Sequence, residues 1–276
     1  MTELTGKELI AYRTARFFED GSVVNLGIGM PTKCLAYLPE GIDIWIDTEN
    51  GAVGLTGAPK PGEDYDPNVV DAGGKPSKLR LGSACFDSFR SFGFIRGGHV
   101  DVTVLGAYEV DAEGSLANWM IPGKAAAGMG GGMDLVTGSK TTIVMTTHCD
   151  KHGNPKIVQK TEMPLTGYKV VDYIVSELAV IHITPEGAVL EEIAADTTVE
   201  EVVAKTGAPK LVQHTEYPLT GWRCVDYFVS ELAVVHFTED GPVLEEISKN
   251  TTIEEVVAKT GAKLIIHEKV GILEDC

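Results

Sequence analysis

The chain has 276 residues, of which 43% are hydrophobic and 23% charged, and its formal net charge is −17. This composition is typical of an ordered globular protein, and the acidity argues against nonspecific nucleic-acid binding, which needs cationic side chains to neutralise phosphates. No run of about 18 uncharged apolar residues is present, so we expect no membrane-spanning helix. Five dispersed cysteines without a C-x-x-C motif, together with acidic residues near the start, predict a cytoplasmic protein with reduced thiols.

The first part of the chain alternates helix and strand signals. A capping box at Thr5–Glu8 predicts a helix that ends before Gly21. The apolar run 22–29 is typical of a buried strand that ends in glycines, and Pro31 favours the first turn of a short helix. The alternating apolar and polar residues of 42–49 predict a second strand.

Later segments continue this alternation. Residues 56–78 are rich in Gly, Pro, Asp and Lys and predict a long surface segment. Strand signals return at 99–110 and at 141–148, on either side of a glycine run at 128–132. Strands that alternate with short helices and glycine-rich turns predict an α/β fold, an open and mostly parallel sheet with flanking helices.

A tandem duplication occupies the C-terminal part of the chain. Residues 156–208 align without gaps on residues 210–262, and 37 of the 53 positions are identical. Two copies are too few for a solenoid, which needs about three repeats or more. We therefore predict a domain at 1–208 that includes the first copy, a second copy at 209–262 as an appended unit, and a tail at 263–276. In each copy a Thr-Thr-(Val/Ile)-Glu-Glu motif predicts a capped helix.

Gly27 and Gly29 lie between a predicted strand and a predicted helix. Glycines at such a place let a ligand approach the backbone, and Asp47 follows 20 residues after Gly27, as in a dinucleotide-binding motif. The third glycine of that motif is missing. A glycine turn without a ligand remains the alternative.

Glu49-Asn50-Gly51 ends the second predicted strand. Asn-Gly is a strong signal for a hairpin turn, which would leave Glu49 solvated. Alternatively, a carboxylate at the carboxyl end of a sheet strand projects into the ligand crevice of an α/β fold. On local pattern alone, the turn is favoured.

Two further clusters have alternative interpretations. The glycines of 128–133 could direct successive backbone N–H groups at one oxygen, or form a tight turn. The segment His148-Cys149-Asp150-Lys151-His152 could bind zinc, but without a second ligand pair a solvated turn is favoured, and no metal site is predicted. His182 and His236 occupy matching strand positions in the two copies.

These motifs occur together and in one order, and as a set the chain resembles the β subunit of the family I CoA-transferases, of the acetoacetate, butyrate or 3-oxoacid type. The stretches that carry the resemblance are DGSVVNLGIGMPT, TENG, GSLANWMIPGK, GMGGGMDL and PLTGYKVVDYIVSELAVI, within residues 5 to about 208. The resemblance implies the CoA-transferase (NagB/RpiA-like) fold, with the duplicated unit added. In the family, Ser usually precedes the glutamate of this tetrad, after His or Gln; here Thr48 and Asp47 stand there.

The resemblance implies a role for each motif. Glu49 would be the nucleophile that carries CoA as a glutamyl-CoA thioester, and Gly130, Gly131 and Gly132 would form the oxyanion and CoA loop. Substrate or CoA would also contact the residues Gly27, Gly29, Asn50, Gly51 and Asn118. CoA would be a substrate, with no cofactor, and a separate α subunit would complete a hetero-oligomer. The cations that could meet its phosphates are Lys75, Lys78, Arg80, Arg90 and Arg96.

Two other functions remain open on sequence alone. One is a non-catalytic module that binds a small molecule on the same sheet architecture, because fold alone does not fix function. The other is a dinucleotide-dependent oxidoreductase built on the Gly27 loop.

Overall fold

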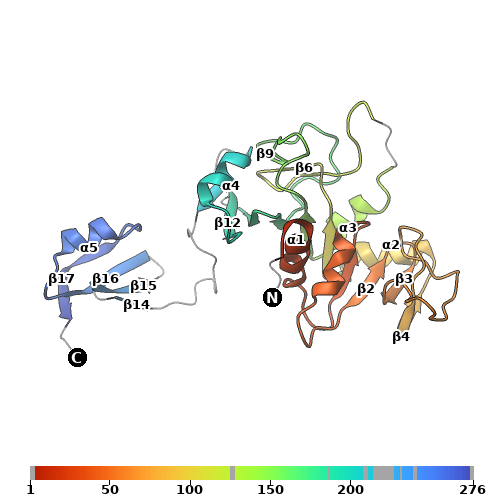
Figure 1. Cartoon of the computed structure of the whole chain (residues 1–276), viewed down its shortest axis with the longest axis horizontal. Helices are drawn as coiled ribbons and strands as arrows, with labels where there is room; N and C mark the ends of the chain where they lie inside the picture. The colour runs from red at the N-terminus through yellow and green to blue at the C-terminus, as the bar shows by residue number, and fades with distance from the viewer. Residues whose placement is uncertain are drawn as a thin grey trace. The chain divides into compact units, whose positions relative to one another are not determined.

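The computed structural model describes residues 4–124, 128–185, 187–207, 211–213, 227–230, 232–238 and 241–273. The chain divides into two compact units, Met1–Pro218 and Leu219–Cys276, which are described separately (Figure 1). No helix within the described ranges is long and apolar enough to cross a bilayer.

Unit 1 is built on a ten-stranded sheet with the order β13-β12-β11-β10-β8-β5-β1-β2-β3-β4. The strands are β1 (Val23–Leu26), β2 (Trp45–Thr48), β3 (Ala52–Leu55), β4 (Leu79–Cys85), β5 (Val102–Leu105), β8 (Thr141–Met145), β10 (Tyr173–Val175), β11 (Ala179–Thr184), β12 (Gly187–Ile193) and β13 (Leu211–Gln213). The five central strands, from β10 to β2, are parallel. Antiparallel pairs extend the sheet on both sides, so the predicted α/β sheet is parallel at its centre.

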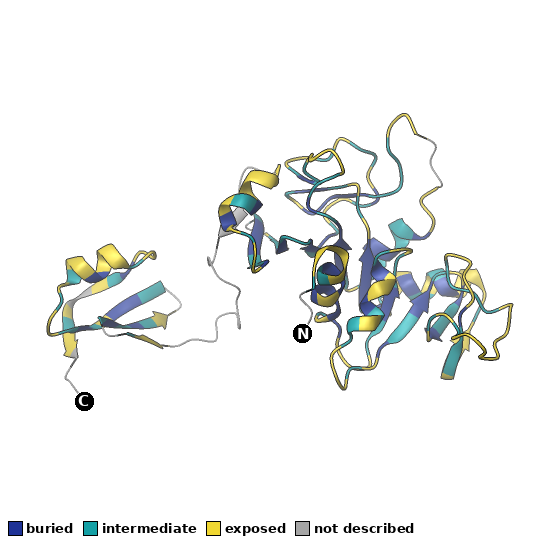
Figure 2. Cartoon of the chain, in the orientation of Figure 1, coloured by how far each residue is buried: buried dark blue, intermediate teal, exposed yellow. Residues whose placement is uncertain are grey.

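Helices cover both faces of this sheet. They are α1 (Gly6–Ala15), the 3-10 helix η1 (Pro31–Tyr37), α2 (Ser88–Arg96), α3 (Gly132–Gly138) and α4 (Val199–Lys205). Successive residues of a strand point to opposite faces, and along β8 Val144 joins the core with α2, α3 and α4, whereas Ile143 and Met145 join the core with α1 and η1. Figure 2 shows the central strands buried between these layers.

A small second sheet in unit 1 has the order β7-β6-β9, from β6 (Glu109–Asp111), β7 (Leu116–Ala117) and β9 (Ile157–Val158). Its fully buried residues Val110, Leu116 and Ile157 belong to the same core as α2 and α3. The small sheet therefore continues the layer that covers this face of the main sheet.

Two local predictions were wrong. The capping box fails because Gly6 adopts a left-handed φ of +53°, and the Thr5 side chain makes no capping hydrogen bond. The amide of Glu8 donates instead to the backbone carbonyl of Thr5, at 3.2 Å. The segment 148–152 is not a solvated turn throughout, because His148 is fully buried.

The two copies of the repeat have the same local structure in different sheets. The first copy supplies β9 to the small sheet of unit 1, β10, β11 and β12 to its main sheet, and the helix α4. The second forms β14 (Tyr227–Val229), β15 (Ala233–Thr238), β16 (Gly241–Ser248) and α5 (Ile253–Lys259) in unit 2. As predicted, threonines cap both helices: Thr198 accepts from the Glu201 amide and Thr252 from the Glu255 amide.

The first copy is anchored to the N-terminal helix. Arg13 is buried in α1, and its Nε donates to the Glu192 carboxylate at 2.8 Å while Nη1 donates to the Ser176 carbonyl at 3.1 Å. Because β10 also pairs with β8, the first copy occupies the position beside β8 in the main sheet.

The unit boundary differs from the expected boundary at residue 208. β13 belongs by sequence to the second copy, but it pairs in parallel with β12 of unit 1, so unit 1 extends to Pro218. Residues 263–276 were expected to be a tail, yet β17 (Ile265–Leu273) pairs with β16 and completes a four-stranded sheet in unit 2.

Candidate active site

Glu49 lies in a tight turn at the carboxyl end of a parallel strand. β2 runs parallel to β1 and then reverses into β3, with Thr48 opposite Ala52. The Gly51 amide donates to the Thr48 carbonyl at 3.0 Å, and Gly51 has a φ of +122°. A Cβ on Gly51 would lie 2.1 Å from the Phe86 carbonyl oxygen, so only glycine fits. The hairpin turn and the strand-end carboxylate, which the sequence presented as alternatives, are both present.

Asn50 links this turn to the surface segment that follows β3. Its Oδ1 accepts from the Thr48 hydroxyl at 2.9 Å, and its Nδ2 donates to the Val70 carbonyl at 3.2 Å. The segment itself is closed by bonds between Asp71 and Lys75, whose amide donates to Asp71 Oδ1 at 2.9 Å. Asn50 therefore has a structural role in holding residues 70–76 beside Glu49.

The glycine run meets Glu49 directly. A Cβ on Gly131 would lie 3.0 Å from Glu49 Cγ, and 3.3 Å from a ring carbon of Phe92. The Gly132 amide already donates to the Met129 carbonyl at 3.1 Å, which removes it from the predicted set of oxyanion donors. Gly130 and Gly131 remain as the residues whose amides could meet an oxygen near Glu49.

Asn118 lies close to Gly132 of the glycine run. Its Oδ1 accepts from the Thr166 hydroxyl at 2.6 Å, and its Nδ2 donates to the Gly106 carbonyl at 3.2 Å. Gly132 fits against both side chains, since a Cβ there would lie 3.5 Å from the Thr166 methyl and 4.0 Å from Asn118 Oδ1. The Asn118 side chain is thus held by Thr166 and Gly106, outside the glycine run, and lies beside Gly132.

The two glycines of the N-terminal loop have different reasons to be glycine. The Gly27 amide donates to the Val104 carbonyl at 2.9 Å, and a Cβ on Gly27 would lie 2.9 Å from that same oxygen. Close packing of β1 on β5 therefore requires Gly27. Gly29 has a φ of +99° and open space around it, and its carbonyl accepts from the Thr32 hydroxyl at 2.9 Å.

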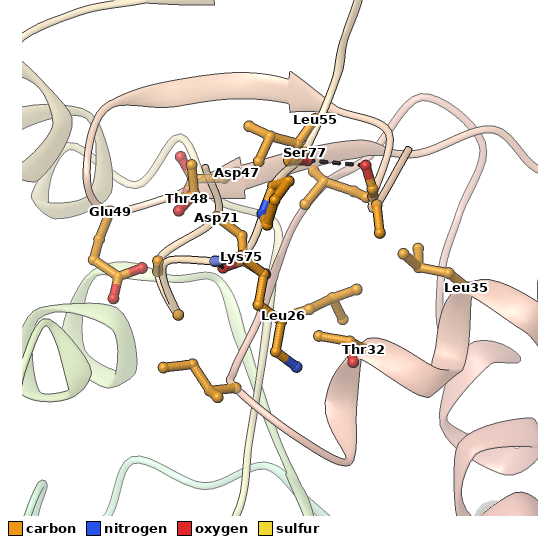
Figure 3. Close-up of a pocket in the computed structure, with 17 residues that line it drawn as sticks. Leu26, Thr32, Leu35, Asp47, Thr48, Glu49, Leu55, Asp71, Lys75 and Ser77 are labelled. Atoms are coloured by element: carbon orange, nitrogen blue, oxygen red, sulfur yellow. Dashed lines mark hydrogen bonds between the residues drawn. The ribbon is translucent and has the colours of Figure 1, made fainter. Parts of the chain in front are cut away.

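A pocket of about 310 Å³ opens beside Glu49. Figure 3 shows Glu49 on one side of it and Thr32 and Leu35 on the other. Most lining side chains are apolar or small: Leu26, Ile28, Leu35, Ile46, Leu55, Ala58, Ala72 and Pro76. The hydroxyl and charged side chains that line it are Thr32, Thr48, Ser77, Asp47, Glu49, Asp71 and Lys75. The sequence did not reveal this pocket, because loop 56–78 supplies one wall.

Asp47 lines the same pocket as Glu49. Its side chain is 2% exposed, and its Oδ2 accepts from Asn25 Nδ2 at 3.1 Å, while Oδ1 has no partner among the described residues. The pKa of Asp47 is raised to about 6 as the net result of three effects. Burial raises the pKa most, the bond from Asn25 lowers it, and the nearby Glu49 charge raises it. A buried carboxyl bonded to Asn25 is poorly placed to accept a ribose hydroxyl, which argues against the dinucleotide alternative.

Four of the five candidate cations are paired. Lys78 contacts Glu63 at 2.9 Å and Arg96 contacts Asp134 at 2.7 Å. Arg80 Nη1 donates to Asp43 at 2.8 Å, and Arg90 lies 3.9 Å from Asp87. Lys75 lines the pocket with Glu49.

The suspected zinc cluster is a hydrogen-bonded core position. His148 Nδ1 lies 3.0 Å from the Ser176 hydroxyl and Nε2 lies 2.8 Å from the Thr206 hydroxyl. Burial lowers the pKa of His148 to about 4, with a smaller contribution from the Lys205 charge. Within the described ranges no group of three or more His, Cys, Asp or Glu side chains could hold a metal ion.

Comparison with known proteins identifies the family of this chain. A model of the family "Coenzyme A transferase" matches residues 7–205. The β subunit of the acetate CoA-transferase of Haemophilus influenzae is 51% identical over 189 residues, which cover 68% of this chain and 84% of that protein. One subunit of a probable succinyl-CoA:3-ketoacid coenzyme A transferase of Bacillus subtilis is 45% identical over 61% of this chain and 77% of its own length.

A solved structure agrees with this assignment at the level of the fold. An acyl-CoA transferase from Escherichia coli O157:H7 superposes with a TM-score of 0.62 at 22% identity, covering 80% of this chain and 44% of that chain. The match to the family model spans Glu49, the glycine run and residues 156–205 of the first copy. The chain therefore belongs to the coenzyme A transferase family, in which it corresponds to the β subunit of the family I enzymes.

Proposed function

We propose that this chain is the β subunit of a CoA-transferase that moves CoA between an acyl-CoA and a short-chain or 3-oxo carboxylic acid, of the acetoacetate or butyrate type, through a glutamyl-CoA thioester on Glu49. The observation that carries the proposal is the position of Glu49, at the edge of an apolar pocket and in contact with Gly131 of the glycine run. A carboxylate in this position can act as a nucleophile toward a thioester.

The first half of the reaction transfers the acyl group to the protein. A carboxylate oxygen of Glu49 attacks the thioester carbon, the carbon–sulfur bond breaks, and CoA leaves as a thiolate. The product is an acyl-glutamyl anhydride. The tetrahedral intermediate carries an oxyanion, which backbone N–H groups of Gly130 and Gly131 would stabilise; one such donor contributes about 3 kcal/mol in a hydrolase oxyanion hole.

The second half transfers CoA. The thiolate attacks the Glu49 carbonyl carbon of the anhydride, the bond to the acyl oxygen breaks, and the free acid leaves as a carboxylate. Glu49 then holds CoA as a thioester, and an acceptor acid reverses the two steps. No proton source or cofactor is needed, because one thioester is exchanged for another and CoA is the substrate.

The pocket supports an apolar acyl chain. Its volume is at the small end of ligand sites, which span about 300–1,000 Å³, and aliphatic side chains from β1, β2, β3 and η1 form much of its wall. A second carboxylate in the substrate would lie close to the carboxylates of Asp47 and Asp71, which would repel it. Among the described lining residues, Lys75 is the one cation that could attract it. Monocarboxylic acids therefore fit this pocket better than dicarboxylic acids.

The remaining parts of the proposal concern the partner and the location. The similar acetate CoA-transferase proteins of Haemophilus influenzae and Escherichia coli are named as β subunits, so we propose that this chain acts with an α subunit in a hetero-oligomer. We place the enzyme in the cytoplasm, because Cys34, Cys85 and Cys149 are free thiols, as expected in a reducing compartment.

The test is a covalent adduct on Glu49. The chain with its α subunit is incubated with acetoacetyl-CoA or butyryl-CoA, digested at low pH and analysed by mass spectrometry. We expect CoA on the peptide that contains Glu49, and none with Glu49→Gln. An unmodified Glu49 peptide during turnover would exclude the mechanism.

Glu113→Gln is the matched control, because Glu113 is an exposed carboxylate that pairs with Lys169 outside the pocket. It should leave the adduct and the rate unchanged. Binding of CoA without turnover by the wild-type complex would favour the non-catalytic binding module instead.

A further inference from the structure

The open edge of the main sheet carries a leucine whose side chain is almost completely exposed. β4 is the last strand of the ten-stranded order, so its outer edge is unpaired among the described residues. Leu81 in β4 is 99% exposed, and Phe89 in the first turn of the following helix α2 is 87% exposed. Figure 2 shows β4 in the colours of intermediate and exposed residues. Unpaired edges and exposed apolar side chains mark association sites unless the fold protects them.

The backbone on both sides of Leu81 is held by its neighbours in β4. The pairing of β3 with β4 is irregular between Val53 and Leu55, and Leu81 lies in the bulge that results. On one side of it, the Arg80 guanidinium lies 4.1 Å from the Trp45 ring centroid and donates to Asp43. On the other side, the Ser83 hydroxyl is within hydrogen-bond distance of the Gly54 and Arg80 carbonyls. The strand segment that presents Leu81 is therefore already ordered before a partner docks.

This edge is continuous with the nucleophile turn. Ala52, which follows Gly51, pairs with Cys85 at the end of β4, and the Phe86 amide donates to the Gly51 carbonyl at 2.9 Å. Phe92 of α2 lies against Gly131 beside Glu49. A protein that docks on β4 and the start of α2 therefore reaches the rim of the Glu49 site.

The charge of the surface favours a different chain over a second copy of this one. The basic side chains of 78–96 are each paired with a carboxylate, which leaves the β4 edge close to neutral in a chain of net charge −17. Two copies of this chain would repel each other through their net charge. A different subunit need not have the same large negative charge, so this electrostatic repulsion need not oppose its binding.

We propose that the α subunit docks on the β4 edge, with Leu81 and Phe89 as the apolar anchors of the contact. This inference rests on the proposed α-dependent function and extends it to a surface. The α subunit would add to the unpaired edge of β4 and cover the two side chains, and it would thereby form the wall of the active site that faces Glu49. Large apolar and aromatic side chains at the centre of an interface contribute most of its binding energy.

The test measures binding, separately from turnover. The α subunit that is co-expressed with this chain is purified and titrated against wild type, Leu81→Asp and Phe89→Asp by calorimetry. We expect each substitution to raise the Kd at least 30-fold, as for interface hot spots. Val203→Asp is the matched control, because Val203 is an exposed apolar residue (49%) on α4, and it should change the Kd less than 2-fold.

The outcomes separate this inference from the proposed function. Wild-type affinity in Leu81→Asp and Phe89→Asp would overturn the docking surface, even if the Glu49 adduct forms. An α subunit that docks at this edge but yields no Glu49 adduct would overturn the proposed function alone. If this chain is instead dimeric by itself and Leu81→Asp makes it monomeric, the edge joins two copies and the inference is wrong. At saturating α subunit, the kcat of both variants should return to the wild-type value.

Discussion

Gly131 and Glu49 are in such close contact that a single methyl group on Gly131 would lie 3.0 Å from Glu49 Cγ. The backbone of Gly131 has a φ of −85°, which any residue can adopt, so backbone strain is not the reason for glycine here. The space taken by the Glu49 side chain is the reason. The substitution Gly131→Ala therefore acts on the nucleophile directly.

We expect Gly131→Ala to lower kcat by about 10-fold to 100-fold, because displacement of a reacting group by about 1 Å has costs of this size. The melting temperature should change little. Gly93→Ala is the control, since a Cβ at Gly93 in α2 would meet nothing within 4 Å. Steady-state kinetics with the α subunit would decide the question, and full activity in Gly131→Ala would show that this contact does not constrain the nucleophile.

Asp47 should make the protein less stable as the pH rises. The pKa of Asp47 is raised from 3.8 to about 6, mainly by burial, so the folded state holds the proton more tightly than the unfolded state does. Stability therefore falls between about pH 4 and pH 6 and stays lower above that range. The substitution Asp47→Asn removes this loss, and we expect it to stabilise the protein by about 2 kcal/mol at pH 7.5 and little at pH 4.

Urea denaturation of unit 1 at the two pH values measures this effect. Glu113→Gln is a suitable control, because Glu113 is exposed and lies outside the pocket, so the same measurement should give a free energy of unfolding close to that of wild type. If Asp47→Asn is no more stable than wild type at pH 7.5, the burial of Asp47 does not destabilise the folded protein.

His148 should have the opposite dependence on pH. Burial lowers its pKa from 6.5 to about 4, so the unfolded state binds a proton more readily than the folded state. The stability from neutral His148 is present above about pH 6.5 and is lost as the pH falls toward 4, by about 3 kcal/mol in total. We expect His148→Gln to be less stable at pH 7 but to lose less stability on acidification.

The control for His148 is His152→Gln, because His152 is an exposed residue in the same segment. This substitution should leave the free energy of unfolding at pH 7 close to the wild-type value. If the curve of His148→Gln parallels that of wild type between pH 6.5 and 4, the buried imidazole is not the group that titrates.

The sequence indicated candidate residues for the site, but not the geometry that brings them together. Motifs that occur in one order indicated Glu49 and the glycine run, but their contact depends on the order of strands in the sheet, which local periodicity does not contain. For the same reason the pocket was missed, since loop 56–78 folds back beside residues of β1, β2 and η1.

His148 shows why a local pattern can mislead. Its neighbours Cys149, Asp150 and Lys151 are typical of a solvated turn, whereas its partners Ser176 and Thr206 come from the first copy of the repeat. The Thr5 cap failed for a backbone reason, the left-handed conformation of Gly6. The caps at Thr198 and Thr252 were predicted correctly because the residues that follow them continue a regular helix.

These two caps provide a matched pair of substitutions in the two copies. Thr198→Ala and Thr252→Ala each remove a hydroxyl that accepts an amide hydrogen bond at 3.2 Å. Each should destabilise its own unit by about 1 kcal/mol. Because α4 belongs to unit 1 and α5 to unit 2, hydrogen exchange should show the loss in different segments for the two variants. A loss in both units from either variant would mean that the units unfold together.

Removal of residues 219–276 should leave an active β subunit. Unit 1 retains the ten-stranded sheet, the Glu49 turn and the glycine run, and the first copy already occupies the position beside β8. Unit 2 forms its own four-stranded sheet, in which β17 joins three strands of the second copy, with a core that includes Ala233, Val235, Leu244 and Ile247. We therefore expect the truncated chain to keep the melting temperature of unit 1 and, with the α subunit, the wild-type rate.

Arg13→Met is a control for this truncation. It leaves the length of the chain unchanged but removes the hydrogen bonds from α1 to Glu192 and Ser176. It should destabilise unit 1 equally in the full and the truncated chain, because these bonds join α1 to the first copy alone. Thermal unfolding of both chains measures this effect. An insoluble truncated chain would show instead that the second copy is needed for folding.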